Sequence, residues 1–294
     1  MKNQSTISLV LGSGGARGLA HIGIIHWLKK NGFEIASVSG CSMGSLVGGI
    51  YAAGKLDQFE QWICNLKIID MIGLLDFSWE KTGLIKGDKL INALRELAGD
   101  PLIKDLAIPF TAVAADVSHE KEVWISEGNM FDAIRASISL PLFFTSVEYR
   151  GSHLIDGGVL NPVPIAPTFK DGTDMTIAVN LGGPVETANE DQDKITPAKE
   201  GILQIGDKIN EFLSRLPFPE TDKAKRDWGS YDVATQAFDA MQGTIARQKL
   251  AAYPPDHVIE IARNVCGTLE FDRAKEMIDL GYKKADEALA HLVN

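Results

Sequence analysis

The sequence has few cysteines and no surplus of basic residues. Its three cysteines, Cys41, Cys64 and Cys266, lack the C-x-x-C spacing of zinc or redox motifs. They predict neither a disulfide framework nor a metal site, and free thiols are typical of a reducing compartment. The 29 Lys and Arg residues are outnumbered by 39 Asp and Glu residues, which gives a net charge of -10. This balance argues against a nucleic-acid partner, because such proteins need basic side chains to displace counterions from phosphates.

Long apolar runs are also lacking. No window approaches the roughly 18 uninterrupted apolar residues that a membrane-spanning helix requires. The first residues run directly into a strand-like segment at 7–11, with no signal-peptide core or cleavage site before it. We therefore expect a cytoplasmic protein, whose contact with a membrane, if it has one, is peripheral.

The chain does contain enough apolar residues for a large core, since 45% of its residues are hydrophobic and 23% are charged. From residue 7 to about 181, short apolar segments alternate with longer segments of helical period, which predicts a mostly parallel sheet covered by helices. Strands are expected at 7–11, 36–39, 109–116, 122–126, 153–156 and 175–180. Helices are expected at 18–31, 43–53, 57–66, 88–98, 129–136 and 162–168.

The whole chain is expected to have three parts. The first is this core, which spans 1–185. Residues 186–200 are polar and acidic without any period, and they predict a connecting loop. Residues 201–294 are expected to be mainly helical and to pack on the same domain. Within them, amphipathic stretches lie near 201–215 and 231–250, a strand is expected at 257–261, and a last helix at about 270–291.

The strongest local signal is the G-x-S-x-G sequence of residues 40–44. It follows an apolar strand and precedes a helix, which is the context of a nucleophile elbow. Gly40 and Gly44 would remove side chains that collide in the tight turn, and Ser42 would project at a helix N-terminus, where an oxyanion is favoured. On its own this sequence is equally compatible with a simple glycine-rich turn. Cys41 is interpreted as a small buried residue and not as the nucleophile.

A glycine-rich loop, Gly-Ser-Gly-Gly-Ala-Arg-Gly at residues 12–18, follows the first strand. Successive backbone N–H groups in such a loop form an anion-binding nest. A dinucleotide site is the competing interpretation, but its G-x-G-x-x-G pattern would place glycine where Arg17 stands, and the elbow occupies the position of the acidic ribose partner. We therefore favour an oxyanion loop.

A third motif is Leu-Ile-Asp-Gly-Gly at residues 154–158, an apolar strand that ends in Asp156. Alone it would be a β-turn with an Asx cap. Together with the other two motifs, it predicts a site, because all three follow strands and would converge at the carboxyl edge of a parallel sheet.

The three motifs, in this order and spacing, resemble those of the patatin-like phospholipases. The resemblance covers residues 7–185, including Ala-Ser-Ile-Ser-Leu-Pro-Leu-Phe-Phe at 136–144 and Asn-Pro-Val-Pro at 161–164, and it is closer to the bacterial branch of the family. It implies a three-layer α/β/α fold and a lipid acyl hydrolase of the phospholipase A or lysophospholipase type. No metal or cofactor is implied, and the expected substrate is an acyl ester or phospholipid.

The resemblance also implies residue roles. Ser42 would be the nucleophile and Asp156 its base, while the amides of Gly14 and Gly15 form an oxyanion hole that Arg17 braces. The supporting glycines would be Gly12, Gly18, Gly40, Gly44, Gly157 and Gly158. A carboxylate is a weak base for a serine hydroxyl, so burial is expected to raise the pKa of Asp156. No histidine has a motif of its own.

Two questions stay open at this point. A nucleotide-binding module and a catalytically silent regulatory protein on a hydrolase fold are alternative functions. The apolar run at residues 68–79 is either a buried core segment or a flap over the cleft that exposes Leu74, Leu75, Phe77 and Trp79 to lipid.

Overall fold

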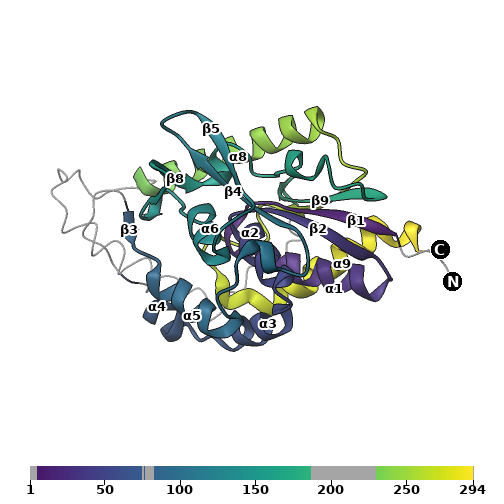
Figure 1. The fold of residues 1–294 in the computed structure, drawn as a ribbon, viewed down its shortest axis with the longest axis horizontal. Helices are drawn as coiled ribbons and strands as arrows, with labels where there is room; N and C mark the ends of the chain where they lie inside the picture. The colour runs from purple at the N-terminus through teal and green to yellow at the C-terminus, as the bar shows by residue number, and fades with distance from the viewer. Residues whose placement is uncertain (1–4, 75, 77–82, 187–229, 294) are drawn as a thin grey trace.

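The computed structural model describes residues 5–74, 76, 83–186 and 230–293 (Figure 1). Its main sheet has eight strands in the order β10-β9-β1-β2-β4-β8-β7, with β5 also paired to β4. The strands are β1 (Thr6–Leu11), β2 (Glu34–Cys41), β4 (Phe110–Asp116), β5 (Lys121–Ile125), β7 (Val147–Tyr149), β8 (Ser152–Asp156), β9 (Met175–Gly183) and β10 (His257–Ala262). The short strands β3 (Gly83–Ile85) and β6 (Leu142–Phe144) form a separate pair.

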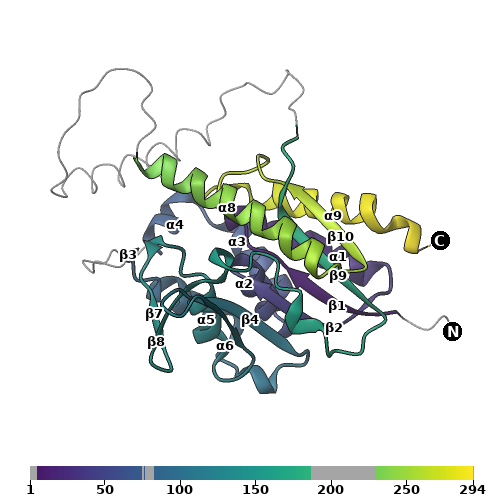
Figure 2. The same cartoon turned by 90° about the horizontal axis from the view of Figure 1, so that it is seen from above.

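The helices lie on both faces of this sheet. They are α1 (Ala20–Lys30), α2 (Met43–Ala52), α3 (Leu56–Asn65), α4 (Ile68–Gly73), α5 (Asp88–Ala98), α6 (Met130–Ser137), α8 (Ser230–Ala252) and α9 (Ala274–Leu289). Figures 1 and 2 show α8 on one face of the sheet and α1, α2 and α9 on the other. The expected three-layer α/β/α fold with a mostly parallel sheet is therefore confirmed.

The two layers around the sheet differ in size. The large core fills the face covered by α1, α2, α6 and α9. Under α8 the core is small, and Val10 and Ala178 of the sheet pack there against Ala246 of the helix. Because β1 is buried on both faces, its sequence is a nearly continuous apolar run, as expected of an inner parallel strand.

Most expected elements are present, but one helix is absent. Residues 162–168 form no α-helix and contain only a 3-10 turn at Ala166–Thr168. Pro162, Pro164 and Pro167 explain the difference, since each lacks the N–H that a helix needs. Helix α4 and the three-residue strands β3, β6 and β7 are present but were not expected from the sequence. The stretch at 201–215 and nearly all of the acidic segment at 186–200 lie outside the described residues.

The motifs at the ends of β2 and β8 do converge, but the expected reason, that both strands are parallel members of the sheet, is wrong. β8 runs antiparallel to β4, so Asp156 does not lie at the end of a parallel strand. Residues 112–116 of β4 pair with β5 on one edge, and the other edge is shared by β2 and then β8. Cys41 pairs with Val113, and Asp156 pairs with the next residue, Ala114. The carboxyl ends of β2 and β8 therefore face each other along one edge of β4.

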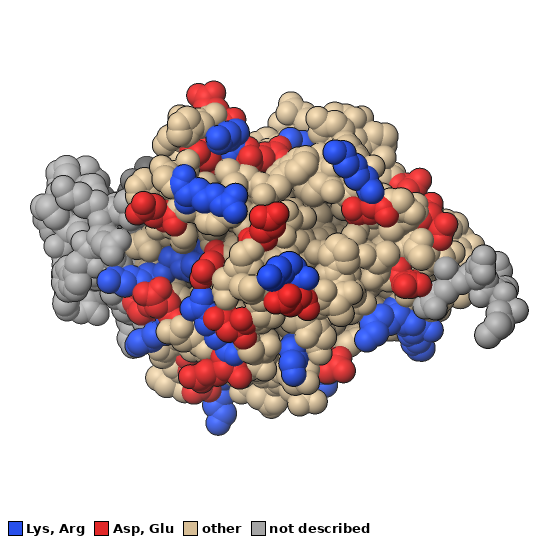
Figure 3. Space-filling view, viewed as in Figure 1, with Lys and Arg blue, Asp and Glu red and all other residues tan. Residues whose placement is uncertain are grey.

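The surface shows charges of both signs. On the face in Figure 3, the described Lys and Arg side chains are interspersed with Asp and Glu side chains, so that face carries no extended basic patch. Among the described residues, no helix combines the length and apolar character needed to cross a bilayer.

Helices α1 and α9 approach each other closely at two glycines. A Cβ added to Gly281 of α9 would overlap the carbonyl of Ala20, and one added to Gly23 of α1 would overlap the carbonyl of Ile278. The close approach brings the C-terminal helix against the first helix of the core. Only glycine fits at these two points, because the obstructing atoms belong to backbone.

We predict that Gly281→Ala lowers the free energy of unfolding by about 2 kcal/mol, measured by chemical denaturation, because the added methyl group forces the helices apart. Gly243→Ala is the matched control, since this helical glycine would meet only the Arg247 side chain at 3.6 Å. It is expected to leave stability unchanged or to raise it by less than about 1 kcal/mol. Equal effects of the two substitutions would contradict the close-packing account.

Candidate active site

Ser42 lies in a strained turn between β2 and α2. Its backbone has φ 54° and ψ -124°, a conformation that a residue with a side chain rarely adopts. A Cβ at Gly40 would overlap the carbonyl of Gly44, and a Cβ at Gly44 would overlap the carbonyl of Leu11. The two glycines therefore allow the tight turn, and the N-terminus of α2 begins directly after Ser42.

Ser137, at the end of α6, holds this turn in place. Its hydroxyl accepts a hydrogen bond from the Ser42 N–H at 2.9 Å and donates one to the Val113 carbonyl at 2.6 Å. Ser137 is fully buried. It thus ties the strained residue to β4, next to the point where β2 ends. Ser137 belongs to the motif at 136–144, but nothing in that motif indicates this role.

Asp156 is fully buried beside the elbow. Its Oδ1 accepts a hydrogen bond from the Gly158 N–H at 2.7 Å, whereas Oδ2 makes no hydrogen bond of standard geometry to a described residue. Burial raises the pKa of Asp156 to about 6, and the Ser42 hydroxyl, the Gly158 N–H and the Cys41 thiol act in the opposite direction. Asp156 Oδ2 is therefore the carboxyl oxygen that remains available to the Ser42 hydroxyl.

Cys41 is the small buried residue that the sequence predicted. Its Sγ lies 3.9 Å from Oδ1 of Asp156, and its side chain is inaccessible to solvent. Burial, together with the nearby Asp156 carboxyl, raises the pKa of this thiol well above its ordinary value. A thiol that stays protonated is a poor nucleophile.

The glycine-rich loop offers two free donors. On either side of them, the Ser13 N–H donates to the Pro162 carbonyl at 2.8 Å and the Ala16 N–H donates to the Thr268 carbonyl at 2.9 Å. Between these anchors, the N–H groups of Gly14 and Gly15 make no hydrogen bond to a described residue. Both glycines line the same pocket as Ser42. Free N–H groups in a fixed loop can bind an oxyanion.

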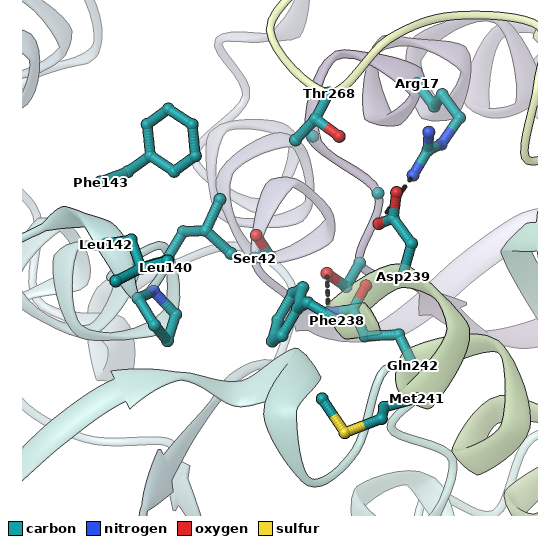
Figure 4. A pocket seen from close by; sticks show the side chains of 14 residues that line it. Arg17, Ser42, Leu140, Leu142, Phe143, Phe238, Asp239, Met241, Gln242 and Thr268 are labelled. Atoms are coloured by element: carbon teal, nitrogen blue, oxygen red, sulfur yellow. Dashed lines mark hydrogen bonds and ion pairs between the residues drawn. The ribbon is translucent and has the colours of Figure 1, made fainter. Parts of the chain in front are cut away.

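The buried Arg17 links the glycine-rich loop to two later segments of the chain. Its Nη1 donates to the carbonyls of Arg263 and Cys266 at 3.0 and 3.1 Å, and its Nη2 lies 3.8 Å from Oδ1 of Asp239. Burial lowers the pKa of Arg17, with Asp239 acting against this effect. These contacts join Arg17 to the 263–266 segment and to α8, and the guanidinium is directed at Asp239 (Figure 4).

The other supporting glycines allow close approaches of backbone and side chains. A Cβ at Gly12 would be 2.6 Å from the Val179 carbonyl oxygen. A Cβ would overlap Met43 at Gly18, the Val113 carbonyl at Gly157, and the Gln242 side chain at Gly158.

His21 is a buried support and does not line the site. Its Nε2 donates to the Gly12 carbonyl at 2.9 Å, and burial lowers its pKa to about 4, so the ring is neutral near pH 7. His153 is exposed on β8. Neither of the two pockets at Ser42, as far as the described residues form them, is lined by a histidine.

Ser42 lies between two pockets. The first is the mouth of the site, where Ser42 faces Leu140 and Phe143 on one side and Phe238 and Gln242 of α8 on the other (Figure 4). Gln242 Nε2 donates to the Ser13 hydroxyl at 3.2 Å, which joins α8 to the glycine loop. This position of α8 has no signal in the sequence, because its amphipathic pattern does not indicate which strand ends the helix faces.

The second pocket is apolar, and its empty space, together with the part that is open to solvent, amounts to about 1270 Å³. It starts at Ser42 and Gly15 and extends between α2, α3, α4 and α5. Its side chains are almost all aliphatic or aromatic, among them Met43, Leu46, Phe59, Trp62, Met71, Ile72, Leu74, Leu90, Leu94, Ile138 and Phe143.

The apolar run at 68–79 forms part of this pocket. Met71, Ile72 and Leu74 are half-buried and line it, and no described side chain of the run is fully buried. The run is therefore not a core segment where it is described. Leu75, Phe77 and Trp79, which would form the exposed tip of a flap, lie outside the described residues.

Comparison with known proteins gives consistent matches. A family model described as patatin-like phospholipase matches residues 9–169. An uncharacterized NTE family protein of Mycobacterium tuberculosis is 36% identical over 96% of this chain and 91% of its own length. Lysophospholipase NTE1 of Cryptococcus neoformans is 28% identical over 96% of this chain but only 17% of its own length. Among solved structures, VipD from Legionella pneumophila matches with 13% identity and a TM-score of 0.44 over 97% of this chain and 67% of its own.

The raised pKa of Asp156 predicts a pH-dependent cost to stability. Asp156 binds its proton more tightly in the folded state, so its contribution to stability is present below its unfolded pKa of 3.8 and is lost as pH rises through about 6. Asp156→Asn should therefore match the parent near pH 4 and exceed it by up to about 3 kcal/mol near pH 8 in chemical denaturation.

Asp116→Asn is the control of opposite sign. Hydrogen bonds from Ser152 and His119 lower the pKa of Asp116 to about 2, so its charged form stabilises the fold above pH 3.8 and the variant should be less stable than the parent near pH 8. A constant difference between Asp156→Asn and the parent across this range would contradict the raised pKa.

Proposed function

Because the chain belongs to the patatin-like phospholipase family, we propose that it is a serine hydrolase of lipid esters that uses a dyad of Ser42 and Asp156. The observation that carries the proposal is the junction of β2 and β8 on one edge of β4, which brings the strained Ser42 and the buried Asp156 together. Membership of the family does not define which ester is hydrolysed, because ester specificity depends on this chain's own site.

In the proposed mechanism, Asp156 accepts the hydroxyl proton while Ser42 Oγ attacks the ester carbonyl carbon. The N–H groups of Gly14 and Gly15 hold the oxyanion of the tetrahedral intermediate. The intermediate collapses to an acyl-enzyme, and Asp156 gives its proton to the departing alcohol. Asp156 then accepts a proton from a water molecule that attacks the acyl-enzyme, and it returns this proton to Ser42 Oγ as the second tetrahedral intermediate collapses and releases the fatty acid.

The two pockets suggest how a lipid ester lies in the site. The apolar pocket starts at Ser42 and fits a hydrocarbon chain, because nearly all its lining side chains are apolar. The mouth, with Ser13 and Gln242, fits the alcohol part of the ester. The described residues form one apolar pocket at Ser42, which favours a lipid with one acyl chain over a lipid with two. A lysophospholipid is such a lipid. The protein would take this substrate from a membrane surface that it contacts peripherally.

We predict that a fluorophosphonate probe labels the protein at a single serine and that Ser42→Ala abolishes both labelling and hydrolysis of p-nitrophenyl butyrate. Only a serine with an adjacent base and oxyanion donors reacts rapidly with such probes. Mass spectrometry of the labelled peptide identifies the site. Labelling of the Ser42→Ala variant would contradict the assignment, and an unreactive parent would favour the catalytically silent alternative.

We also predict that Leu74→Asp reduces hydrolysis of a long-chain ester by at least about tenfold more than hydrolysis of the butyrate ester, because a carboxylate in the apolar pocket opposes a hydrocarbon chain. Ile69→Asp is the matched control in α4, the helix that Leu74 follows directly, since Ile69 is 67% exposed and does not line the pocket. Similar losses on both esters in Leu74→Asp would show that this pocket does not hold the acyl chain.

A further inference from the structure

Leu142 occupies an unfavourable position for its residue type. Residues 140–143 form a turn in which the Phe143 N–H donates to the Leu140 carbonyl at 3.1 Å. Pro141 is the second residue of the turn, and Leu142 is the third with φ 71°. This is the arrangement of a type II turn, in which glycine or asparagine is favoured at the third position. Of the four described non-glycine residues with positive φ, Leu142 is the apolar one.

Burial does not explain this leucine. Its side chain is 54% exposed, so a bulky apolar group is held in a strained backbone conformation and directed partly into water. Neither local conformation nor core packing favours leucine there. The leucine side chain therefore contributes little to the stability of the fold. Glycine or asparagine would fit this turn with less backbone strain.

Leu142 is one of several exposed apolar side chains that line the two pockets at Ser42. Met241 of α8 is 56% exposed and lies on the opposite side of the mouth from Leu142 (Figure 4). Leu269, which lines the apolar pocket, is 39% exposed. These three residues, which we call the apolar rim, join the protein surface to the interior of the apolar pocket.

The mouth carries almost no free charge. The charged residues that line it, as far as it is described, are Arg17 and Asp239, and these two face each other at 3.8 Å. The chain as a whole has a net charge of -10, which opposes adsorption to anionic lipid. An uncharged apolar rim on an acidic protein fits a zwitterionic lipid surface, into which apolar side chains insert without electrostatic attraction.

We propose that the apolar rim of Leu142, Met241 and Leu269 docks the protein on a zwitterionic lipid surface with the mouth of the site facing the lipid. A protein partner or a second copy seated on this rim would cover the mouth and exclude substrate. A lipid surface covers the same mouth and delivers an acyl chain into the pocket behind it. This inference rests on the proposed function, which it deepens by assigning the surface that meets the substrate's source.

The first test measures binding without turnover. Three proteins are sedimented with phosphatidylcholine vesicles. They are the Ser42→Ala variant and two double variants, which combine Ser42→Ala with Leu142→Asn or with Met241→Gln. The Ser42→Ala protein should bind, and each added substitution should weaken binding by about tenfold, since one apolar side chain no longer leaves water. Phe169→Asn is the control, because Phe169 is 60% exposed and lies outside both pockets, and it should bind like its parent.

The second test uses the strain at Leu142. Leu142→Asn should raise Tm by about 2 °C, because asparagine is tolerated at positive φ, while the ratio of vesicle hydrolysis to butyrate hydrolysis falls by about tenfold. Met241→Gln should lower the same ratio without raising Tm. A protein that becomes more stable and less active on lipid has lost a functional side chain and not a structural one.

The outcomes separate this inference from the proposed function. If the parent hydrolyses the butyrate ester but the Ser42→Ala protein fails to bind vesicles, the docking surface is wrong and the proposed hydrolase stands. If both rim variants bind vesicles like their parent, or if they alter only self-association in size-exclusion chromatography, the rim is not a lipid-docking surface. A parent that binds vesicles but hydrolyses no ester would overturn the proposed function instead.

Discussion

The site depends on a buried carboxyl group held at the junction of two strands. β2 ends at Cys41 and β8 ends at Asp156, on successive residues of the same edge of β4. Asp156 is fully buried between these ends, so burial favours its neutral form and raises its pKa to about 6. The raised pKa makes the carboxylate a better base near neutral pH, at the expense of stability.

Several neighbouring features follow from this junction. Gly157 must lack a side chain because a Cβ there would overlap the Val113 carbonyl, and Cys41 must be small because its Sγ lies 3.9 Å from the Asp156 carboxyl. Ser137 joins the Ser42 amide to the Val113 carbonyl, so the strained turn is fixed to the strand that aligns both chain ends. The two pockets meet at this point, and the mouth adds a few polar side chains, such as Ser13 and Gln242, to the apolar interior of the second pocket.

Much of this arrangement was predictable from sequence. The glycines at 40 and 44 have a steric reason that a strand–turn–helix pattern already indicates, and the buried Asp156 follows from an apolar strand that ends in a carboxylate. The antiparallel direction of β8 was not predictable, because strand direction depends on chain connections that local periodicity does not record. Likewise, the position of Gln242 at the glycine loop depends on tertiary packing of α8. Leu142 has no sequence signal beyond the preceding proline, since leucine is unusual at this turn position.

The most direct test of the central claim, that Asp156 is the base for Ser42, is the pH dependence of kcat/KM for a short soluble ester. The account predicts that kcat/KM of the parent rises with an apparent pKa of about 6, and that Asp156→Asn is lower by at least about a hundredfold and loses this rise. A variant Asp156→Asn that keeps both the rate and the same pH profile, or a parent whose profile is abolished equally by His153→Ala, would contradict it.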